Sequence, residues 1–378
     1  MMLTDILERK IRDSVYIIAE IGQNHQGCLA VAKSMILRAK SIGCHCVKFQ
    51  KSDLKAKFTH SALQRQYVSE HSWGSTYGQH KEYLEFSKEQ YRELQSFSHD
   101  IGIDFTASAM DERSLAFLEE LKVPFIKIGS GDANNFPLLI KASRLETPLI
   151  ISTGMQNIST IDKIVEIMGQ AGKDNFALMH CVSAYPVPPE ASNVGLIPMF
   201  INRYPRIVIG YSGHELGIDI TQAAILSGAR IVERHFTLDK DQKGSDHCCS
   251  LDPQEFKSLV DRIERLKHIK VLQKNTYCAA EISNILGDKL ELKEALKDIT
   301  KKEIQECELP CQRKLGKTIV ASRNLKKGHK LLMEDLAIKV SEPSGIPAEM
   351  YFHIIGMELI EELNEDDPVI AAVLSSVE

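Results

Sequence analysis

The stretch that decides the fold is residues 15–25, Val-Tyr-Ile-Ile-Ala-Glu-Ile-Gly-Gln-Asn-His. It opens with the apolar run Val15–Ala19, and a carboxylate, Glu20, and a polar turn follow directly. An unbroken apolar run is typical of a parallel strand that is buried on both faces. No G-x-G-x-x-G motif follows this run, whereas a doubly wound dinucleotide-binding sheet carries that motif after its first strand. The stretch therefore predicts a buried strand that delivers polar side chains at its end.

Seven further apolar runs repeat this pattern, with amphipathic segments between them. The predicted strands are Val15–Ala19, Cys44–Phe49, Ile103–Ala107, Pro124–Ile128, Pro148–Ser152, Phe176–Cys181, Arg206–Gly210 and Ala229–Arg234. After the first strand, four apolar residues recur at helical spacing: Leu29, Ala32, Ile36 and Ala39. Eight strand–helix units over about 270 residues have the size and rhythm of a (β/α)8 TIM barrel. We predict this α/β fold over a doubly wound open sheet.

The composition is that of an ordinary globular protein, and it excludes several classes. Of the 378 residues, 43% are hydrophobic and 26% charged, so wholesale disorder is excluded. The net charge of -5 argues against nucleic-acid binding. No apolar run approaches the roughly 18 residues of a membrane span, and residues 1–10 are too charged for a signal peptide. The nine cysteines form no CxxC pair, which favours reduced thiols in a cytoplasmic protein.

Changes in composition divide the chain into three parts. We predict a barrel domain over residues 1–273, a charged and largely helical linker over 274–313, and a small domain of short strands and turns over 314–378. Such a short terminal domain has a small core, so we expect it to be stabilised by packing against a partner. Within the barrel, a polar insertion runs from Lys51 to about Glu85, and loops of that length are usually lids or binding loops.

Polar residues gather where the predicted strands end, and this is where barrel enzymes place their active sites. Two lysines, Lys48 and Lys127, stand in otherwise apolar strands. A single such lysine could simply extend its ammonium to solvent. Two of them, with Ser130, Ser152 and Ser212 at neighbouring strand ends, are better suited to hold a phosphate or carboxylate.

Two histidines, His214 and His235, end adjacent strands. Neighbouring strands lie about 4.8 Å apart, so both imidazoles could reach one ion. Two nitrogens, completed by oxygen ligands from substrate and water, would form an open site for Mn²⁺ or Mg²⁺. A purely structural role for both histidines stays an equal alternative. Glu20, Glu233 and Asp246 are the carboxylates available for proton transfer or hydroxyl binding, or for charge balance beside the lysines.

Five motifs in this chain closely resemble those of the sialic acid synthase family. They are residues 18–27 (Ile-Ala-Glu-Ile-Gly-Gln-Asn-His-Gln-Gly), 47–50 (Val-Lys-Phe-Gln), 127–132 (Lys-Ile-Gly-Ser-Gly-Asp), 152–155 (Ser-Thr-Gly-Met) and 233–235 (Glu-Arg-His). Residues 243–247, Lys-Gly-Ser-Asp-His, are similar to the animal N-acylneuraminate-9-phosphate synthases in particular. From Lys314 onward the chain resembles the antifreeze-like (SAF) domain of the family.

The resemblance implies a condensation of phosphoenolpyruvate with N-acetylmannosamine 6-phosphate that gives N-acetylneuraminate 9-phosphate and phosphate with C–O cleavage. It implies catalytic roles for Glu20, Lys48, Lys127, His214 and His235, with the two histidines holding the metal. The implied phosphoenolpyruvate-binding residues are Lys48, Ser108, Lys127, Ser130, Ser152, Ser183 and Ser212, of which Ser183 replaces a bacterial Asn. The implied sugar-binding residues are Glu20, Gln50, Tyr185, Glu233, Asp246 and Lys317, where Lys317 replaces a bacterial Arg. It also implies a domain-swapped homodimer, in which the SAF domain of one subunit covers the other's barrel.

The identity of the acceptor sugar leaves alternatives open. Lysines and other basic groups of the insertion and of the loop near Asp246 could hold a second phosphate: Lys51, Lys55, Lys57, Arg65, His71, Lys81 and Lys243. This favours the 6-phosphate as acceptor over unphosphorylated N-acetylmannosamine. A condensation with another sugar acceptor and a non-catalytic binding paralogue are the remaining alternatives.

Overall fold

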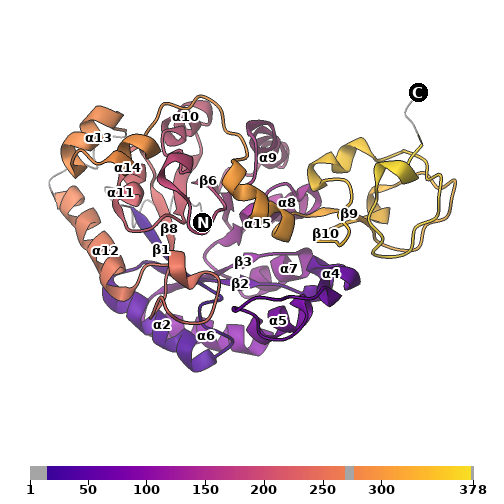
Figure 1. Cartoon of the computed structure of the whole chain (residues 1–378), viewed down its shortest axis with the longest axis horizontal. Coiled ribbons are helices and arrows are strands. Elements are labelled where there is room, and N and C mark those ends of the chain that lie inside the picture. Colours follow the sequence, from indigo (N-terminus) through magenta and orange to yellow (C-terminus); the bar gives the residue numbers. More distant parts are fainter. Residues whose placement is uncertain (1–14, 269–275, 376–378) are drawn as a thin grey trace.

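A closed barrel of eight parallel strands forms the larger part of the molecule (Figure 1). The computed structural model describes residues 15–268 and 276–375. Each strand pairs with the next along the chain, and the eighth pairs with the first. The strands are β1 (Tyr16–Gly22), β2 (Cys46–Lys51), β3 (Asp104–Ala109), β4 (Ile126–Ile128), β5 (Leu149–Ser152), β6 (Phe176–Cys181), β7 (Val208–Gly213) and β8 (Ile231–His235). The predicted TIM barrel is confirmed, and β6 has the predicted bounds, whereas the other strands differ from theirs by one to three residues at one or both ends.

The interior of the barrel changes from apolar to polar along the strands. The layer nearer the N-terminal ends of the strands is one apolar cluster, formed by Tyr16, Ile18, Cys46, Phe125, Ile150, Ala177, Met179 and Ile231. Because side chains on a strand alternate between its two faces, the next inward positions on β1, β2 and β8 are Glu20, Lys48 and Glu233. The polar layer therefore lies at the C-terminal ends of the strands.

Helices surround the barrel and bury their apolar faces against the outer side of the strands. They are α2 (Leu29–Ile42), α6 (Lys88–Asp100), α7 (Glu112–Glu120), α8 (Phe136–Ser143), α9 (Ile158–Gln170), α10 (Leu196–Arg203), α11 (Asp219–Leu226) and α12 (Pro253–His268). In α2, Ala32, Met35, Ile36 and Ala39 are buried in the main core. Gly43 ends this helix at a φ of 103°, a backbone conformation that a residue without Cβ adopts at no steric cost.

The insertion after β2 is helical rather than a polar loop, which corrects the sequence-based expectation. It contains α3 (Leu54–Lys57), α4 (His60–Gln64) and α5 (Tyr77–Leu84). Side chains of Asp53, Thr59 and Thr76 cap these helices at their N-termini, and such caps stabilise short helices. Phe58 and Tyr77 pack with Val340 in a small apolar cluster, so the insertion also joins the barrel to the C-terminal domain.

The segment after α12 is largely helical and packs on the barrel. It contains α13 (Ala279–Leu286), α14 (Leu290–Ala295), a 3-10 turn at Glu306–Glu308 and α15 (Leu309–Leu315). Ile282, Leu292 and Ala295 are buried in the main core. A Cβ on Gly195 would lie 2.3 Å from the carbonyl oxygen of Lys297, so glycine at the start of α10 is what lets this segment approach closely.

The C-terminal domain is small and has a core of its own. Its strands β9 (Thr318–Ala321) and β10 (Leu336–Lys339) pair antiparallel, and short turns connect the rest, as the composition predicts. Figure 1 shows it beside the barrel, with α15 between the two. Across the described part of the chain, no helix combines the length and the apolar character needed to cross a membrane.

Candidate active site

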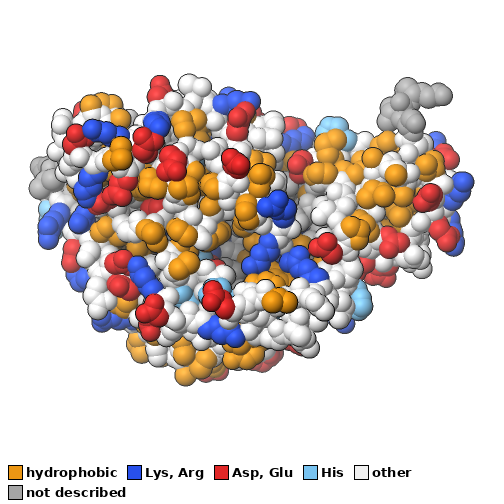
Figure 2. Space-filling view, viewed as in Figure 1, with side chains coloured by type: hydrophobic (Ala, Val, Ile, Leu, Met, Phe, Trp, Pro, Cys, Tyr) orange, Lys and Arg blue, Asp and Glu red, His pale blue; other side chains and the backbone are white. Residues whose placement is uncertain are grey.

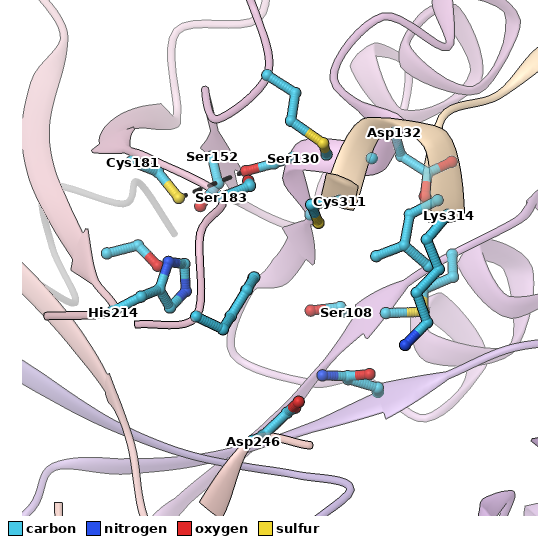
Figure 3. Close-up of a pocket in the computed structure, with 18 of the residues that line it drawn as sticks. Ser108, Ser130, Asp132, Ser152, Cys181, Ser183, His214, Asp246, Cys311 and Lys314 are labelled. Atoms are coloured by element: carbon cyan, nitrogen blue, oxygen red, sulfur yellow. Dashed lines mark hydrogen bonds between the residues drawn. The ribbon is translucent and has the colours of Figure 1, made fainter. Parts of the chain in front are cut away.

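A cavity of about 390 Å³ opens at the C-terminal ends of the strands. Figure 3 shows side chains from different strands and from α15 converging on it. Every residue to which the family resemblance assigned a catalytic, phosphoenolpyruvate-binding, sugar-binding or metal-binding role lines this cavity. These residues are Glu20, Lys48, Gln50, Ser108, Lys127, Ser130, Ser152, Ser183, Tyr185, Ser212, His214, Glu233, His235, Asp246 and Lys317. The geometry brings all of them together, while their individual roles stay predictions.

Four buried charges alternate in sign across the floor of the cavity. The Lys48 ammonium lies 2.5 Å from a carboxylate oxygen of Glu20 and 3.6 Å from one of Glu233. The Lys127 ammonium lies 3.7 Å from the other oxygen of Glu233. Strand register explains this order, because Glu20 on β1 is directly opposite Lys48 on β2. Since all four side chains are buried, neighbouring charges of opposite sign are what hold them there.

The two carboxylates differ in their proton affinity. Burial raises the pKa of Glu20, and Lys48 only partly offsets this effect. Burial also raises the pKa of Glu233, but the two lysines outweigh it and leave this pKa well below its usual value. Burial lowers the pKa of Lys127. A carboxyl with a raised pKa beside one that stays ionised is an arrangement suited to acid–base work.

Hydroxyl groups complete the surroundings of the two ammonium groups. Lys48 Nζ donates to Ser108 Oγ at 3.0 Å, and Lys127 Nζ donates to Ser152 Oγ at 2.5 Å. The hydroxyls of Ser130 and Ser183 approach the backbone of Gly154, where a Cβ would lie 2.8 Å and 2.3 Å from them. Glycine at this position therefore keeps the hydroxyls close together. Ammonium and hydroxyl donors gathered on one side of a cavity form a binding site for an anion.

The two histidines face one another, with ring centroids 5.4 Å apart. His214 donates from Nδ1 to the carbonyl oxygen of Val182 at 2.8 Å, so Nε2 is the ring nitrogen through which it could bind a metal ion. His235 Nδ1 is buried without a hydrogen-bond partner among the described residues, and Asp246 lies 3.8 Å away. The ring of Tyr185 packs on His214 at 4.2 Å between centroids.

These histidines fit an open divalent-metal site. Burial lowers the pKa of His235 to about 4, so its imidazole is neutral at pH 7, as a metal ligand must be. Burial also lowers the pKa of His214, but Cys181 and the Val182 carbonyl outweigh it, and the net shift is upward. Within the described ranges, no three His, Cys, Asp or Glu side chains form a metal-binding group. The two imidazoles would therefore need oxygen ligands from substrate and water.

The segment after the barrel contributes residues that the sequence did not reveal. Cys307, Pro310, Cys311, Lys314 and Leu315 line one side of the cavity, and Figure 3 shows Cys311 and Lys314 reaching into it from α15. No local pattern signals this contact, because it joins segments far apart in the sequence. The C-terminal domain adds Lys317, whose ammonium pairs with Asp132 and donates to the Met110 carbonyl of its own barrel.

Of the seven basic residues expected to ring the mouth, only Lys57 and Lys81 line the cavity. The other expected basic residues lie outside its lining: Lys51, Lys55, Arg65, His71 and Lys243. Lys51 lies 2.6 Å from Glu85, so it holds the insertion together. The guanidinium of Arg65 lies over the Tyr77 ring and the ammonium of Lys243 over Trp73.

Comparisons with known proteins agree with this geometry. A model described as the NeuB family matches residues 35–274, and one described as the SAF domain matches residues 316–374. The N-acetylneuraminate-9-phosphate synthase of Drosophila melanogaster is 60% identical over 98% of both chains. The human N-acetylneuraminate-9-phosphate synthase is 45% identical, over 96% of this chain and 93% of that one.

A solved structure confirms the architecture. The spore coat polysaccharide biosynthesis protein SpsE from Bacillus subtilis is similar with a TM-score of 0.76, at 26% identity, over 97% of this chain and 96% of that one. The family model covers more than half of the chain, and the relatives span almost all of it. The chain therefore belongs to the NeuB family of sialic acid synthases and carries an SAF domain after its barrel.

Proposed function

We propose that this protein condenses phosphoenolpyruvate with N-acetylmannosamine 6-phosphate to give N-acetylneuraminate 9-phosphate and inorganic phosphate. The observation that carries the proposal is one cavity in which two buried lysines, their serine partners and two facing histidines meet. The 60% identity to the Drosophila N-acetylneuraminate-9-phosphate synthase supports the same activity.

The reaction forms one carbon–carbon bond and breaks one carbon–oxygen bond. The methylene carbon of phosphoenolpyruvate attacks the aldehyde carbon of the open-chain sugar. Water adds to the former enol carbon, and the C–O bond to phosphate then breaks. Lys48 and Lys127, with Ser108, Ser130 and Ser152, would hold the phosphate and carboxylate of phosphoenolpyruvate throughout. Fixed donors in a buried site stabilise developing negative charge without having to reorganise.

Glu20 is the group best placed to handle the proton of the attacking water. Its carboxylate is buried, pairs with Lys48 and accepts a hydrogen bond from Gln50 at 2.9 Å. Because burial raises its pKa, it holds a proton more readily than an exposed carboxylate does. Glu233, with its lowered pKa, would stay ionised and keep the two lysines in place.

His214 and His235 would hold a divalent ion, Mn²⁺ or Mg²⁺. When bound, such an ion supplies Lewis-acid polarisation of the sugar aldehyde. The support for this part is the buried Nδ1 of His235, which makes no hydrogen bond within the described part of the chain, and the facing of the two rings. Asp246 and Tyr185 flank the histidines and would contact the sugar.

The assembly and the compartment also belong to the proposal. We expect a domain-swapped homodimer, in which the partner subunit's SAF domain would take over the contact that Lys317 makes here with its own barrel. Light scattering should give twice the 42.4 kDa chain mass. A mass of one chain at micromolar concentration would contradict it. The nine cysteines, all in described residues, form no disulfide, which is compatible with a reducing compartment such as the cytoplasm.

Phosphoenolpyruvate labelled with ¹⁸O at its bridging oxygen tests the proposal directly. C–O cleavage places the label in inorganic phosphate, and release should require the sugar acceptor. Label retained in the keto-acid product would contradict C–O cleavage. Binding of phosphoenolpyruvate without any turnover would favour the non-catalytic paralogue, and turnover with unphosphorylated N-acetylmannosamine alone would favour the alternative synthase.

A further inference from the structure

Three of the lysines that line the cavity lack, among the described residues, the carboxylate partners that the other three have. Lys48, Lys127 and Lys317 each face a buried carboxylate. Lys57, Lys81 and Lys314 also line the cavity, but no carboxylate of the described residues lies within ion-pair distance of their ammonium groups. Figure 2 shows Lys and Arg side chains gathered beside the hollow at the centre of this face.

Lys57 is the most deeply buried of the three, with 7% of its surface exposed. Its ammonium lies 2.8 Å from the sulfur of Met110 and 5.1 Å from the centre of the Phe58 ring. A thioether is a weak acceptor, so this buried charge is poorly compensated. Burial, together with the nearby Lys81 and Lys317, lowers the pKa of Lys57 to about 7.

Lys81 and Lys314 approach the same part of the cavity from two other elements. Lys81, on α5, donates to the side-chain oxygen of Gln23 at 2.9 Å. Lys314, on α15, has its ammonium 3.4 Å from the hydroxyl of Tyr67. Burial lowers the pKa of Lys81 to about 8, and Lys314 adds to the effect. Three separate segments thus bring positive charges together, although like charges repel.

A neutral donor lies among these cations. The hydroxyl of Tyr77 is fully buried, lines the cavity and has no hydrogen-bond partner among the described residues. Buried polar atoms are normally satisfied, so an unpartnered one at a cavity wall marks a place for a ligand. Four carboxylates act on these lysines from a distance: Asp132 and Asp111 on Lys57, and Asp246 and Glu85 on Lys81. Two of them are already paired elsewhere, Asp132 with Lys317 and Glu85 with Lys51.

We propose that Lys57, Lys81 and Lys314, with the hydroxyl of Tyr77, form a second anion subsite, which binds the phosphoryl group of the acceptor sugar. This inference rests on the proposed function and adds the residues that distinguish a phosphorylated from an unphosphorylated sugar. A phosphate dianion would satisfy the buried donors and remove the repulsion among the lysines. Phosphoenolpyruvate would then bind at Lys48 and Lys127, which we call the inner anion subsite.

The test compares kcat/KM for N-acetylmannosamine 6-phosphate and for N-acetylmannosamine at saturating phosphoenolpyruvate. In Lys57→Met, Lys81→Met and Tyr77→Phe, the value for the phosphorylated sugar should fall, by roughly 10- to 100-fold for each lysine. The value for the free sugar and the KM for phosphoenolpyruvate should not change. Lys55→Met is the matched control, because Lys55 lies on the same short helix as Lys57 but is exposed and outside the cavity.

Thermal unfolding provides a readout that does not depend on activity. Removing the poorly compensated ammonium of Lys57 leaves no carboxylate unpaired, so Lys57→Met should unfold at the same temperature as the wild type or higher. Added N-acetylmannosamine 6-phosphate should raise the unfolding temperature of the wild type more than that of the variant.

The outcomes separate this inference from the proposed function. A wild-type protein that consumes phosphoenolpyruvate with neither sugar contradicts the proposed function. A wild-type protein that prefers the phosphorylated sugar, with the preference intact in all three variants, overturns the inference alone. An equal loss of kcat/KM for both sugars in the variants would also overturn it, because it would indicate a structural role for these residues.

Discussion

Glu308, in the segment after the barrel, accepts a hydrogen bond at 2.8 Å from the backbone N–H of Ser183, which follows strand β6. The same carboxylate oxygen accepts from the backbone N–H of Met155, after β5, at 2.7 Å. Glu308 is fully buried, and the buried Lys302 beside it donates to the carbonyl of Cys181 at 3.1 Å. Two loops that carry residues of the inner anion subsite are therefore held by a segment outside the barrel strands.

Glu308→Ala should therefore destabilise the protein and weaken binding of phosphoenolpyruvate. Each buried N–H that loses its acceptor costs about 1–3 kcal/mol, unless water replaces it. We expect a lower midpoint in urea and a raised KM for phosphoenolpyruvate. Glu306→Ala is the control, because Glu306 lies in the same 3-10 turn, two residues before Glu308, but is exposed. Equal midpoints and equal KM values in the two variants would show that Glu308 does not position these loops.

Lys48→Met should abolish turnover, and it should also destabilise the protein. The substitution leaves Glu20 buried beside Glu233 without its ammonium partner. Breaking a buried pair in this way typically costs about 3–5 kcal/mol. Adding Glu20→Gln removes the unpaired charge, so the double variant should recover most of the stability but none of the activity. Urea unfolding and phosphate release measure the two effects separately.

Lys127→Met tests the same subsite from the neighbouring strand. Burial already lowers the pKa of Lys127, so we expect a smaller loss of stability than for Lys48→Met and an equally complete loss of activity. Near-normal turnover in both single variants would be incompatible with an anion subsite at these lysines.

Divalent metal should be required, with one ion for each chain. Chelation should stop turnover, and Mn²⁺ or Mg²⁺ should restore it. Calorimetry with Mn²⁺ should show one site that is lost in His214→Ala and in His235→Ala. The exposed His99 supplies the control, since its side chain is 90% accessible and His99→Ala should bind the ion normally. Full activity of dialysed, chelator-treated protein would contradict a metal site.

The kcat/KM for N-acetylmannosamine 6-phosphate should decrease as the pH rises from about 7 to 9. Burial lowers the pKa of Lys57 to about 7 and that of Lys81 to about 8, so both lysines lose their charge in this window. Lys317, Asp132 and Asp111 also act on Lys57, whereas Lys314, Asp246, Tyr67 and Glu85 act on Lys81. Because kcat/KM reports the pKa values of the free enzyme, it should fall for N-acetylmannosamine 6-phosphate.

The free sugar provides the comparison for this pH profile. It has no phosphate to bind, so its kcat/KM should not share the decline caused by these two lysines. A parallel decline for both sugars would assign the titration to a group of the shared chemistry instead. In Lys57→Met, the part of the decline that begins near pH 7 should be absent from the profile for the phosphorylated sugar.

The barrel and the inward-facing residues of its strands could be predicted from the sequence alone. A strand fixes the direction of each side chain by alternation. The apolar positions Ile18 and Cys46 therefore predict that Glu20 and Lys48, two residues further on, face the same interior. The carboxyl ends of parallel barrel strands all meet at one rim, so polar residues at these ends converge whatever their distance in the sequence.

Only the tertiary structure decided which residues outside the strands reach the cavity. Lys55 and Lys57 look alike in the sequence, but the docking of a short helix against Val340 of the C-terminal domain exposes one and buries the other. Lys314 and Glu308 come from a segment whose own pattern predicts only a charged helix. Their roles depend on packing between elements more than 100 residues apart. No local periodicity encodes such packing, because a helix sets the spacing of its own side chains but not where it lies against a distant part of the chain.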